Sequence, residues 1–264
     1  MIKREFKVNL KSFIIWMAVL ILMFLVVYLV YPYIITDESM KSMDEMMKMF
    51  SPEMLKAFNM DMASISTAYG WLKTEGFVYV LLIVGIYASI LGGTILLKEE
   101  SDKTIEYLGT LPITRSKIIT NKLVVGISYI IMMILIFFVF NYISLTISGD
   151  FEQKQFVLLS ITPLFVCIPL FAINLFISTF LHKTKATIGL SLGMVFLFYI
   201  LNVLSELSDK VEFLKYFSIY TLADVRNVLT DIKINPIMII ISLTITVLFV
   251  LLTYVRYNKK ELLN

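Results

Sequence analysis

The sequence predicts an all-α integral membrane protein with six membrane-spanning helices. The chain has 264 residues, of which 59% are hydrophobic and only 16% are charged. A soluble domain carries about 25% charged residues, so this much apolar surface requires lipid as the solvent for much of the chain. The apolar residues are also gathered into long runs, and the charged residues lie between these runs.

Six segments are long enough to cross a bilayer, which takes about 20 apolar residues in a helix. None of them contains Asp, Glu, Lys or Arg, and they are 13–35, 77–97, 123–148, 156–181, 186–205 and 237–255. The first is 23 residues long, whereas the apolar region of a signal peptide has about 7–15 residues. We therefore interpret it as an uncleaved span, and we expect one transmembrane domain over residues 1–264.

The distribution of Lys and Arg predicts the side on which each connection lies. If both termini are cytoplasmic, the inner segments are 1–12, 98–122, 182–185 and 256–264. The outer segments are then 36–76, 149–155 and 206–236. The inner segments hold 14 basic residues in 50 positions, and the outer segments hold 9 in 79. Because basic residues favour the cytoplasmic side, we expect both termini in the cytoplasm.

Several function classes are excluded by what the sequence lacks. A net charge of +3 is too small to indicate nucleic-acid binding. A single cysteine, Cys167, and a single histidine, His182, exclude a disulfide framework and a His-rich metal site. The chain has no Gly-x-x-x-x-Gly-Lys-Ser/Thr phosphate loop, so we expect no ATPase activity and no cofactor in it. No acidic residue lies inside a span, which argues against an intramembrane protease.

Small residues predict where the spans pack closely. In lipid, helices associate where small side chains let the backbones approach. The second span has such residues at helical spacing, and they are Gly85, Ser89, Gly92 and Gly93. The fifth span has Gly189 and Gly193, four residues apart. Either face could pack within the chain or against a second copy of it.

Three asparagines, Asn141, Asn174 and Asn202, lie inside spans three, four and five. An amide in hydrocarbon needs a hydrogen-bond partner, so the simpler interpretation is bonding between helices. The alternative is a polar lining for a substrate path. In the fourth span, Pro163 and Pro169 predict a bend.

The connection between spans two and three, residues 98–122, predicts an amphipathic helix on the inner membrane surface. Ser101 can cap this helix, and Pro112 ends it. Its apolar face consists of Ile105, Leu108 and Leu111. Thr114 or Ser116 can then start a second piece that leads into span three. The first helix could dock into a partner's groove, or it could lie among the lipid headgroups.

The residues of this connection follow a particular order, which is Glu99, Glu100, Thr104, Ile105, Glu106, Leu108, Pro112, Arg115 and Lys122. This order resembles the signature of type-2 ATP-binding-cassette (ABC) permeases, in which an acidic pair precedes Gly-Thr-x-Glu-x-Leu, Pro-x-x-Arg and a Lys. It departs at Lys103, where the family has Gly. The segment 214–220 is similar to the family's segment before the last span, with Ile219 in place of Pro.

The resemblance implies a permease subunit in the bacterial cytoplasmic membrane. Such permeases pair with a second permease, identical or homologous, and bind two ATPase subunits, which hold the ATP and Mg²⁺. The connection 98–122 would dock on the ATPase, and the nine matching residues would carry the coupling. Since Glu99 and Glu100 end a helix, where negative charge is unfavourable, we also expect them to have a basic partner, either Arg115 or Lys122.

The outer connections are rich in methionine and in mixed apolar segments. Residues 37–62 hold eight methionines, which are Met40, Met43, Met46, Met47, Met49, Met54, Met60 and Met62. Thioethers bind Cu(I), but helical spacing of several of these residues with Phe50 and Phe58 favours an amphipathic outer helix. The segments Val211–Tyr220 and Leu222–Leu229 predict short helices that dip into the outer leaflet.

These features together predict the permease subunit of an ATP-driven exporter of an amphipathic peptide, antimicrobial or lipid-like substrate. The alternatives are extrusion of sodium or drugs by the same architecture, and an ATPase-partnered sensor or immunity scaffold that transports nothing. The Met-rich face of segment 37–62 could meet such a substrate.

Overall fold

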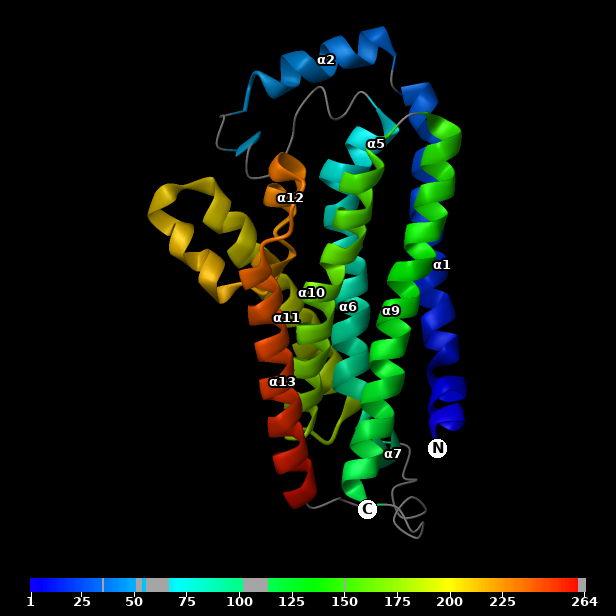
Figure 1. Cartoon of the computed structure of the whole chain (residues 1–264), viewed down its shortest axis with the longest axis vertical. Helices are drawn as coiled ribbons and strands as arrows, with labels where there is room; N and C mark the ends of the chain where they lie inside the picture. The colour runs from blue at the N-terminus through cyan, green and yellow to red at the C-terminus, as the bar shows by residue number, and fades with distance from the viewer. Residues whose placement is uncertain (35, 51–53, 56–66, 102–113, 150, 261–264) are drawn as a thin grey trace.

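The protein is a bundle of six long helices in the computed structural model (Figure 1). The structure describes residues 1–34, 36–50, 54–55, 67–101, 114–149 and 151–260. Within these residues no strand occurs, and six helices have the length and composition of membrane spans. The predicted all-α membrane fold with six spans is therefore confirmed.

The six spans are Ile2–Val30, Ala68–Ile95, Arg115–Ser148, Gln153–Ser178, Thr184–Leu207 and Pro236–Lys259. The corresponding long helices are α1 (Ile2–Ile34), α6 (Phe77–Ile95), α9 (Arg115–Ser148), α10 (Gln153–Ser178), α11 (Thr184–Leu207) and α13 (Pro236–Lys259). The shorter elements are α2 (Asp37–Met47), α5 (Ala68–Trp71), the π-helical turn η1 (Leu72–Gly76), α7 (Lys98–Ser101), the 3-10 helices η2 (Asp209–Phe217) and η3 (Tyr220–Ala223), and α12 (Val225–Asp231).

Three spans begin well before the apolar runs that predict them, and the second of these spans starts at Ala68 rather than at residue 77. The first helix already starts at Ile2, inside the basic segment, and α9 starts at Arg115 rather than at residue 123. The Thr114 hydroxyl caps α9 by accepting from the backbone N–H of Lys117 at 3.3 Å. The second amphipathic piece and span three are therefore one continuous helix. Hydropathy detects only the part of a helix that lies in hydrocarbon, and a helix can continue beyond it.

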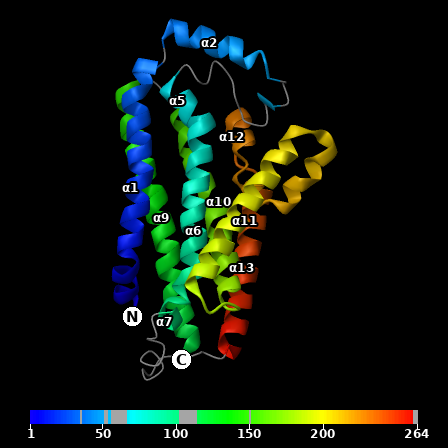
Figure 2. The ribbon, with the colours of Figure 1, turned by 180° about the vertical axis from the view of Figure 1, so that it is seen from behind.

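The helices α6 and α10 form the centre of the bundle, and α1, α11 and α13 lie at its outside (Figures 1 and 2). The central pair packs against each other, α10 also contacts α9 and α13, and α11 packs on α6. The start of α1, the end of α13 and α7 lie at one end, which we call the loop-bearing end. The opposite, distal end carries α2, α5 and α12.

Glycines in α6 set how closely its neighbours approach. A Cβ atom at Gly92 would overlap the backbone carbonyl of Phe171 in α10, so the two backbones touch there. At Gly93 a Cβ would lie 2.7 Å from the Ser191 hydroxyl of α11, and at Gly85 it would lie 2.8 Å from the Tyr220 hydroxyl. Ser89 is fully buried in the same helix. These small residues pack within the chain, as close backbone approach in lipid requires.

Both prolines of α10 lie inside the helix, and the carbonyls that they leave without a backbone N–H partner are satisfied by hydroxyl groups. Pro163 cannot donate to the carbonyl of Leu159, which instead accepts from the Thr162 hydroxyl at 2.8 Å. Pro169 leaves the carbonyl of Phe165 free, and the Ser242 hydroxyl of α13 donates to it at 2.9 Å. The second proline therefore ties α13 to α10. The predicted bend of α10 stays a prediction.

The first part of the Met-rich outer segment forms the helix α2, which lies across the distal end (Figure 1). Thr36 caps it by accepting from the backbone N–H of Ser39. The helix ends at Met47, so the predicted continuation through Phe50 is wrong, while Phe58, Met60 and Met62 lie outside the described residues. Met47 is buried, whereas Met46 and Met49 are exposed.

The connection before the last span forms short helices, as its composition predicts. These helices are η2, η3 and α12. The first packs beside α11, and η3 packs against α10 and α13. Asp224 lies between η3 and α12 in the left-handed region, with φ of 48°, which Asp tolerates better than most residues. On either side of Asp224, both η3 and α12 pack against α10.

Candidate functional site

The connection that carries the signature begins with α7 and ends with the start of α9, both at the loop-bearing end. Four of its signature residues are described, namely Glu99, Glu100, Arg115 and Lys122. The other five are outside the described residues, namely Thr104, Ile105, Glu106, Leu108 and Pro112. The predicted amphipathic helix lies there too, and Ser101, expected to cap it, is the last residue of α7.

Lys122 lies at the centre of a buried ionic cluster between α1, α7 and α9. Its side chain is 1% exposed, and its Nζ lies 2.8 Å from both carboxylate oxygens of Glu99 and 3.2 Å from Glu5. It also donates to the carbonyl of Ile95 at the end of α6. Lys122, one of the two basic residues expected as partners of the acidic pair, is therefore the partner of Glu99. Because water is largely excluded from this site, these acceptors take the place of the hydration that would otherwise stabilise the positive charge.

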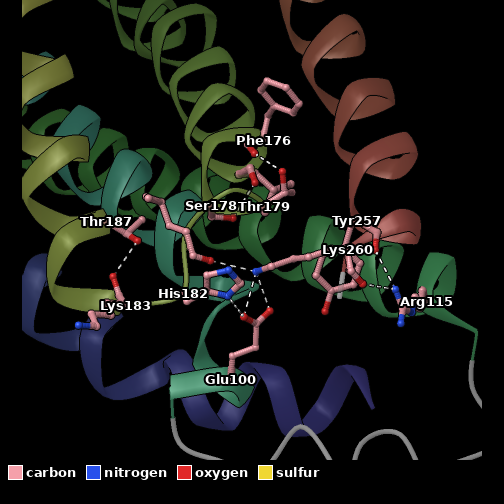
Figure 3. Close-up of polar contacts among 12 residues, drawn as sticks. Glu100, Arg115, Phe176, Ser178, Thr179, His182, Lys183, Thr187, Tyr257 and Lys260 are labelled. Carbon is pink, nitrogen blue, oxygen red and sulfur yellow. Dashed lines mark hydrogen bonds and ion pairs between the residues drawn. The ribbon is translucent and has the colours of Figure 1, made fainter. Parts of the chain in front are cut away.

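Glu100 takes part in a second cluster, which joins α7 to the end of α13 and to the connection after α10 (Figure 3). Lys260 donates to its two oxygens at 2.8 and 2.9 Å, and the same ammonium group donates to the carbonyl of Leu181 at 3.0 Å. The Nδ1 atom of His182 lies 3.2 Å from Glu100. The two neighbouring glutamates therefore have different lysine partners.

Arg115 does not contact the acidic pair in the described structure; it contacts the end of α13 (Figure 3). Its guanidinium group donates to the backbone carbonyls of Tyr257, Asn258 and Lys260, at 3.3, 3.2 and 2.6 Å. The last carbonyls of a helix have no partner within it, and they form the negative end of the helix dipole. The start of α9 is thereby attached to the end of α13.

Three members of these clusters were missed by sequence reasoning, and they are Glu5, His182 and Lys260. Each lies near a predicted span, in a segment whose charged residues were used only to predict the orientation of the chain. A weak signal existed for Glu5, which is the single acidic residue among the basic residues of segment 1–12. Because an ion pair between residues 117 or 160 positions apart depends on tertiary packing, neither spacing nor composition identifies it.

The two clusters and Arg115 together attach both ends of the signature connection to the bundle. Its first end is held through Glu99 and Glu100, and its second end through Arg115 and Lys122. These contacts reach α1, α6, α13 and the connection that follows α10. A displacement of residues 98–122 must therefore move these helices or break buried ion pairs, which costs several kcal/mol.

A cavity of about 610 Å³ lies at the distal end, among the ends of α6, α11 and α13 and the short helices η2, η3 and α12. Its wall includes four carboxylates, from Glu75, Glu206, Glu212 and Asp224, and the ammonium group of Lys215. Burial raises the pKa of the Asp224 carboxyl group, although hydrogen bonds from Asn227 and Asn235 act in the opposite direction. The remaining wall is largely apolar.

The three asparagines are not brought together into one path. Asn141 is buried and accepts a hydrogen bond from the Tyr28 hydroxyl at 2.7 Å, which links α9 to α1. Asn174 is buried in α10 and donates to the carbonyl of Leu170. Only Asn202 lines the distal cavity, where its oxygen accepts from the Thr221 hydroxyl at 3.1 Å. The geometry thus favours packing for Asn141.

A model of the ABC-2 family transporter proteins matches residues 1–262, nearly the whole length of the six-span bundle. The chain belongs to the ABC-2 transporter family. Searches of curated proteins and of solved structures each found no significant match. As an ABC-2 protein it is a multi-pass membrane protein and a permease component of an ABC transporter, a type of assembly in which an ABC ATPase is the partner.

The connection 98–122, which resembles the family's signature, lies at the loop-bearing end. An ABC-2 permease has to receive work from another subunit, and this sequence has no phosphate loop of its own. Among the described residues, no group of His, Cys, Asp and Glu side chains has the arrangement of a metal site. Two features of the described residues are candidates for function, namely the anchored ends of the connection 98–122 and the distal cavity.

Proposed function

We propose that this chain is the transmembrane subunit of an ATP-driven exporter of amphipathic peptides, antimicrobials or lipid-like molecules. A separate ATPase subunit binds the ATP and Mg²⁺, docks on residues 98–122 and displaces them during its cycle. The chain itself performs no hydrolysis. Its termini and the loop-bearing end face the cytoplasm, and the distal cavity faces outward, in agreement with the excess of basic residues at the loop-bearing end.

The observation that carries this proposal is the attachment of the signature connection at both of its ends. Glu99 and Lys122 link it to α1 and α6, and Glu100 and Arg115 link it to α13. The other end of α13 contributes Met238 to the distal cavity. A single rigid helix therefore joins the proposed docking surface to the proposed substrate site. Coupled transport needs such a mechanical link.

We propose a second copy of this chain, or a homologous permease, as the neighbour of α11. Gly189 and Gly193 have no atom within 4 Å of an added Cβ, and the same helix exposes Leu190, Phe196 and Leu197. Close packing of small residues is a common way for helices to associate in lipid. A Cys at position 190 should form a disulfide-linked dimer under oxidation, while a Cys at Leu243, an exposed residue of α13, should not.

The docking step is tested by co-purification of this chain with its ABC ATPase partner. Replacing Leu108 with Asp places a charge on the apolar face predicted for the docking helix, so the ATPase should be lost from the complex. Thr110→Asp adds the same charge on the opposite face of that predicted helix and is the matched control. Retention of a fully coupled ATPase by the Leu108→Asp variant would count against docking through this connection.

The export step is tested in inside-out vesicles that contain both subunits. Accumulation of a labelled cationic peptide that requires ATP supports export, and its absence together with a stable ATPase complex supports the sensor or immunity scaffold. ATP-driven accumulation of ²²Na⁺ instead would support sodium extrusion. The three results are mutually distinguishable in one preparation.

A further inference from the structure

The first three turns of α1 carry basic residues on one face. These residues are all exposed, and they are Lys3, Arg4, Lys7 and Lys11. At 3.6 residues per turn, their positions fall within about a third of the helix circumference. The acidic residue among them, Glu5, is 1% exposed and faces inward, where it pairs with Lys122. Since α1 lies at the outside of the bundle (Figure 2), its basic face points away from the other helices.

The positive charges of this face are not neutralised within the described part of the chain. There, the ammonium groups of Lys7 and Lys11 and the guanidinium group of Arg4 make no hydrogen bond or ion pair. By contrast, the buried lysines at the same end of the bundle, Lys122 and Lys260, each pair with a glutamate. The charges of α1 are therefore available to a partner outside the chain.

A shallow groove of about 320 Å³ lies beside this face, between α1 and α7. Described residues that line it are Val8, Lys11, Ser12, Ile15, Trp16 and Lys98. The Lys98 ammonium group donates to the backbone carbonyl of Val8 at 3.2 Å, which closes the groove on the side of α7. Because Lys98 makes further contacts, we assign the binding charge to α1 alone.

The groove lies at the depth of the lipid headgroups. Lys11 stands two residues before the uncharged run 13–35, and Lys98 directly follows the run 77–97. Both therefore mark the boundary between hydrocarbon and headgroups, where tryptophans such as Trp16 are also enriched. Each headgroup layer is about 5–7 Å thick, and Lys7 lies about 6 Å from Lys11 along the helix. Both ammonium groups can therefore reach a lipid phosphate.

Beyond Lys11 the same face of α1 is aliphatic. Ile14, Leu22 and Leu29 are 55%, 59% and 63% exposed, and in a membrane lipid chains cover such residues. A phospholipid beside α1 thus meets ammonium groups at its phosphate and branched side chains along its acyl chains. The Ser12 hydroxyl in the groove can also donate a hydrogen bond to a phosphate oxygen.

We propose that α1 binds an acidic phospholipid, with the lipid phosphate at Lys7 and Lys11 and the lipid chains along the aliphatic face that follows. A net negative headgroup is favoured because a zwitterionic headgroup brings a cation of its own to the basic face. A lipid is favoured over an acidic protein surface because the groove lies at headgroup depth and continues into apolar side chains. With the loop-bearing end in the cytoplasm, the lipid belongs to the inner leaflet.

This lipid lies across α1 from the anchored connection 98–122. The opposite face of the same turns holds Glu5, whose carboxylate is 3.2 Å from the Lys122 ammonium group, and a helix with its side chains is about 10 Å wide. The lipid therefore holds the outer side of a helix whose inner side holds the signature connection. A role in coupling rests on the function proposed above, whereas the binding does not.

The test measures lipid binding by the full-length chain without any ATPase, in nanodiscs of phosphatidylcholine. The sequence has two tryptophans, so Trp71→Phe leaves Trp16, which lines the groove, as the single fluorescent reporter. The probe is phosphatidylglycerol with brominated chains, which quenches a tryptophan that it contacts. We expect quenching that saturates at a low fraction of this lipid, and weaker quenching by brominated phosphatidylcholine at the same fraction.

Charge variants locate the site. Lys7→Gln and Lys11→Gln should each weaken the binding of brominated phosphatidylglycerol about fivefold, the contribution of one basic residue at an acidic membrane surface. Lys11→Arg keeps the charge and should restore most of the affinity. Lys117→Gln removes an exposed lysine of α9 at the same end but outside the groove, and as the matched control it should change nothing.

Three results would overturn the assignment. Equal quenching by the two brominated lipids would show no preference for negative charge. An equal loss in Lys11→Gln and Lys117→Gln would leave only the general surface potential. Loss of the ATPase from the Lys11→Gln complex with unchanged lipid preference would assign the basic face to a protein partner. The lipid measurements contain no ATPase, so their failure is distinguishable from a failure of the exporter.

Discussion

At the loop-bearing end the ammonium group of Lys122 is enclosed by the carboxylates of Glu5 and Glu99, whereas at the distal end a buried oxygen of Glu75 has no hydrogen-bond partner. Both ends contain charged residues next to lipid-embedded helices. At the first end the opposite charges are paired, and the helix ends are held together by them. At the second end the carboxylates of Glu75, Glu206, Glu212 and Asp224 are among the described residues that line a cavity, together with the ammonium group of Lys215. The comparison indicates that charged side chains hold helix ends together at one end of the bundle and line open space at the other.

The largest effect should follow from Lys122→Ala. This change leaves two buried carboxylates without their common cation, and breaking a buried ion pair from one side costs roughly 3–5 kcal/mol. We expect a strong loss of folded protein and a much lower temperature of unfolding in detergent. Lys117→Ala, at an exposed position of the same helix, is the control and should change little. If the two variants were equally stable, the ionic cluster would not be what holds these helix ends together.

The next effect compares the two ends directly through the same substitution. Glu100→Gln weakens a charge-assisted contact with Lys260 and should cost about 2 kcal/mol of stability. Glu75→Gln removes a carboxylate from the acidic cavity and should leave stability unchanged or raise it. Thermal unfolding of both variants in one detergent checks the opposite signs. If Glu75→Gln destabilised as much as Glu100→Gln, the two ends would not differ in this respect.

A smaller effect is expected from Arg115→Lys. Arg115 donates to three carbonyls at the end of α13, and a lysine cannot reproduce this planar fork of donors. Loss of one or two of these hydrogen bonds should cost about 1–2 kcal/mol. In the complex with its ATPase, substrate-stimulated hydrolysis should fall more than basal hydrolysis does. A proportional fall of both rates would indicate a purely structural role.

The smallest effect concerns Asp224 and the dependence of stability on pH. Burial raises its pKa above the ordinary value of 3.8. At a pH between the two pKa values, the folded state therefore still binds a proton that the unfolded state has released. Stability must therefore fall as pH rises from about 4 to the raised pKa. Asp224→Asn should remove this fall, and Asp231→Asn should not. The amplitude should be small because the carboxyl group is partly solvated.

The sequence was sufficient for the fold because the apolar runs are long and free of charge. The family signature likewise depends on residues close together in the chain, such as Glu99 and Glu100. The sequence did not predict the two ionic clusters, because only the packing of α1 and α13 brings Glu5 and Lys260 to the acidic pair. The cavity was not predicted, because Glu75 and Glu206 lie near the ends of two different spans, in segments that the sequence assigned to separate connections, and only tertiary packing brings them to one wall.

The hydrogen bond from Ser242 to the carbonyl of Phe165 also limits how α13 can move. If α13 slid along its axis by a full turn, this carbonyl, freed by Pro169, would face hydrocarbon without a donor, which is costly in a membrane. Tilting about Ser242 keeps the bond. Because Arg115 holds one end of the helix and Met238 lines the cavity near the other, α13 has the geometry of a lever with a fixed pivot, and inward movement at one end corresponds to outward movement at the other.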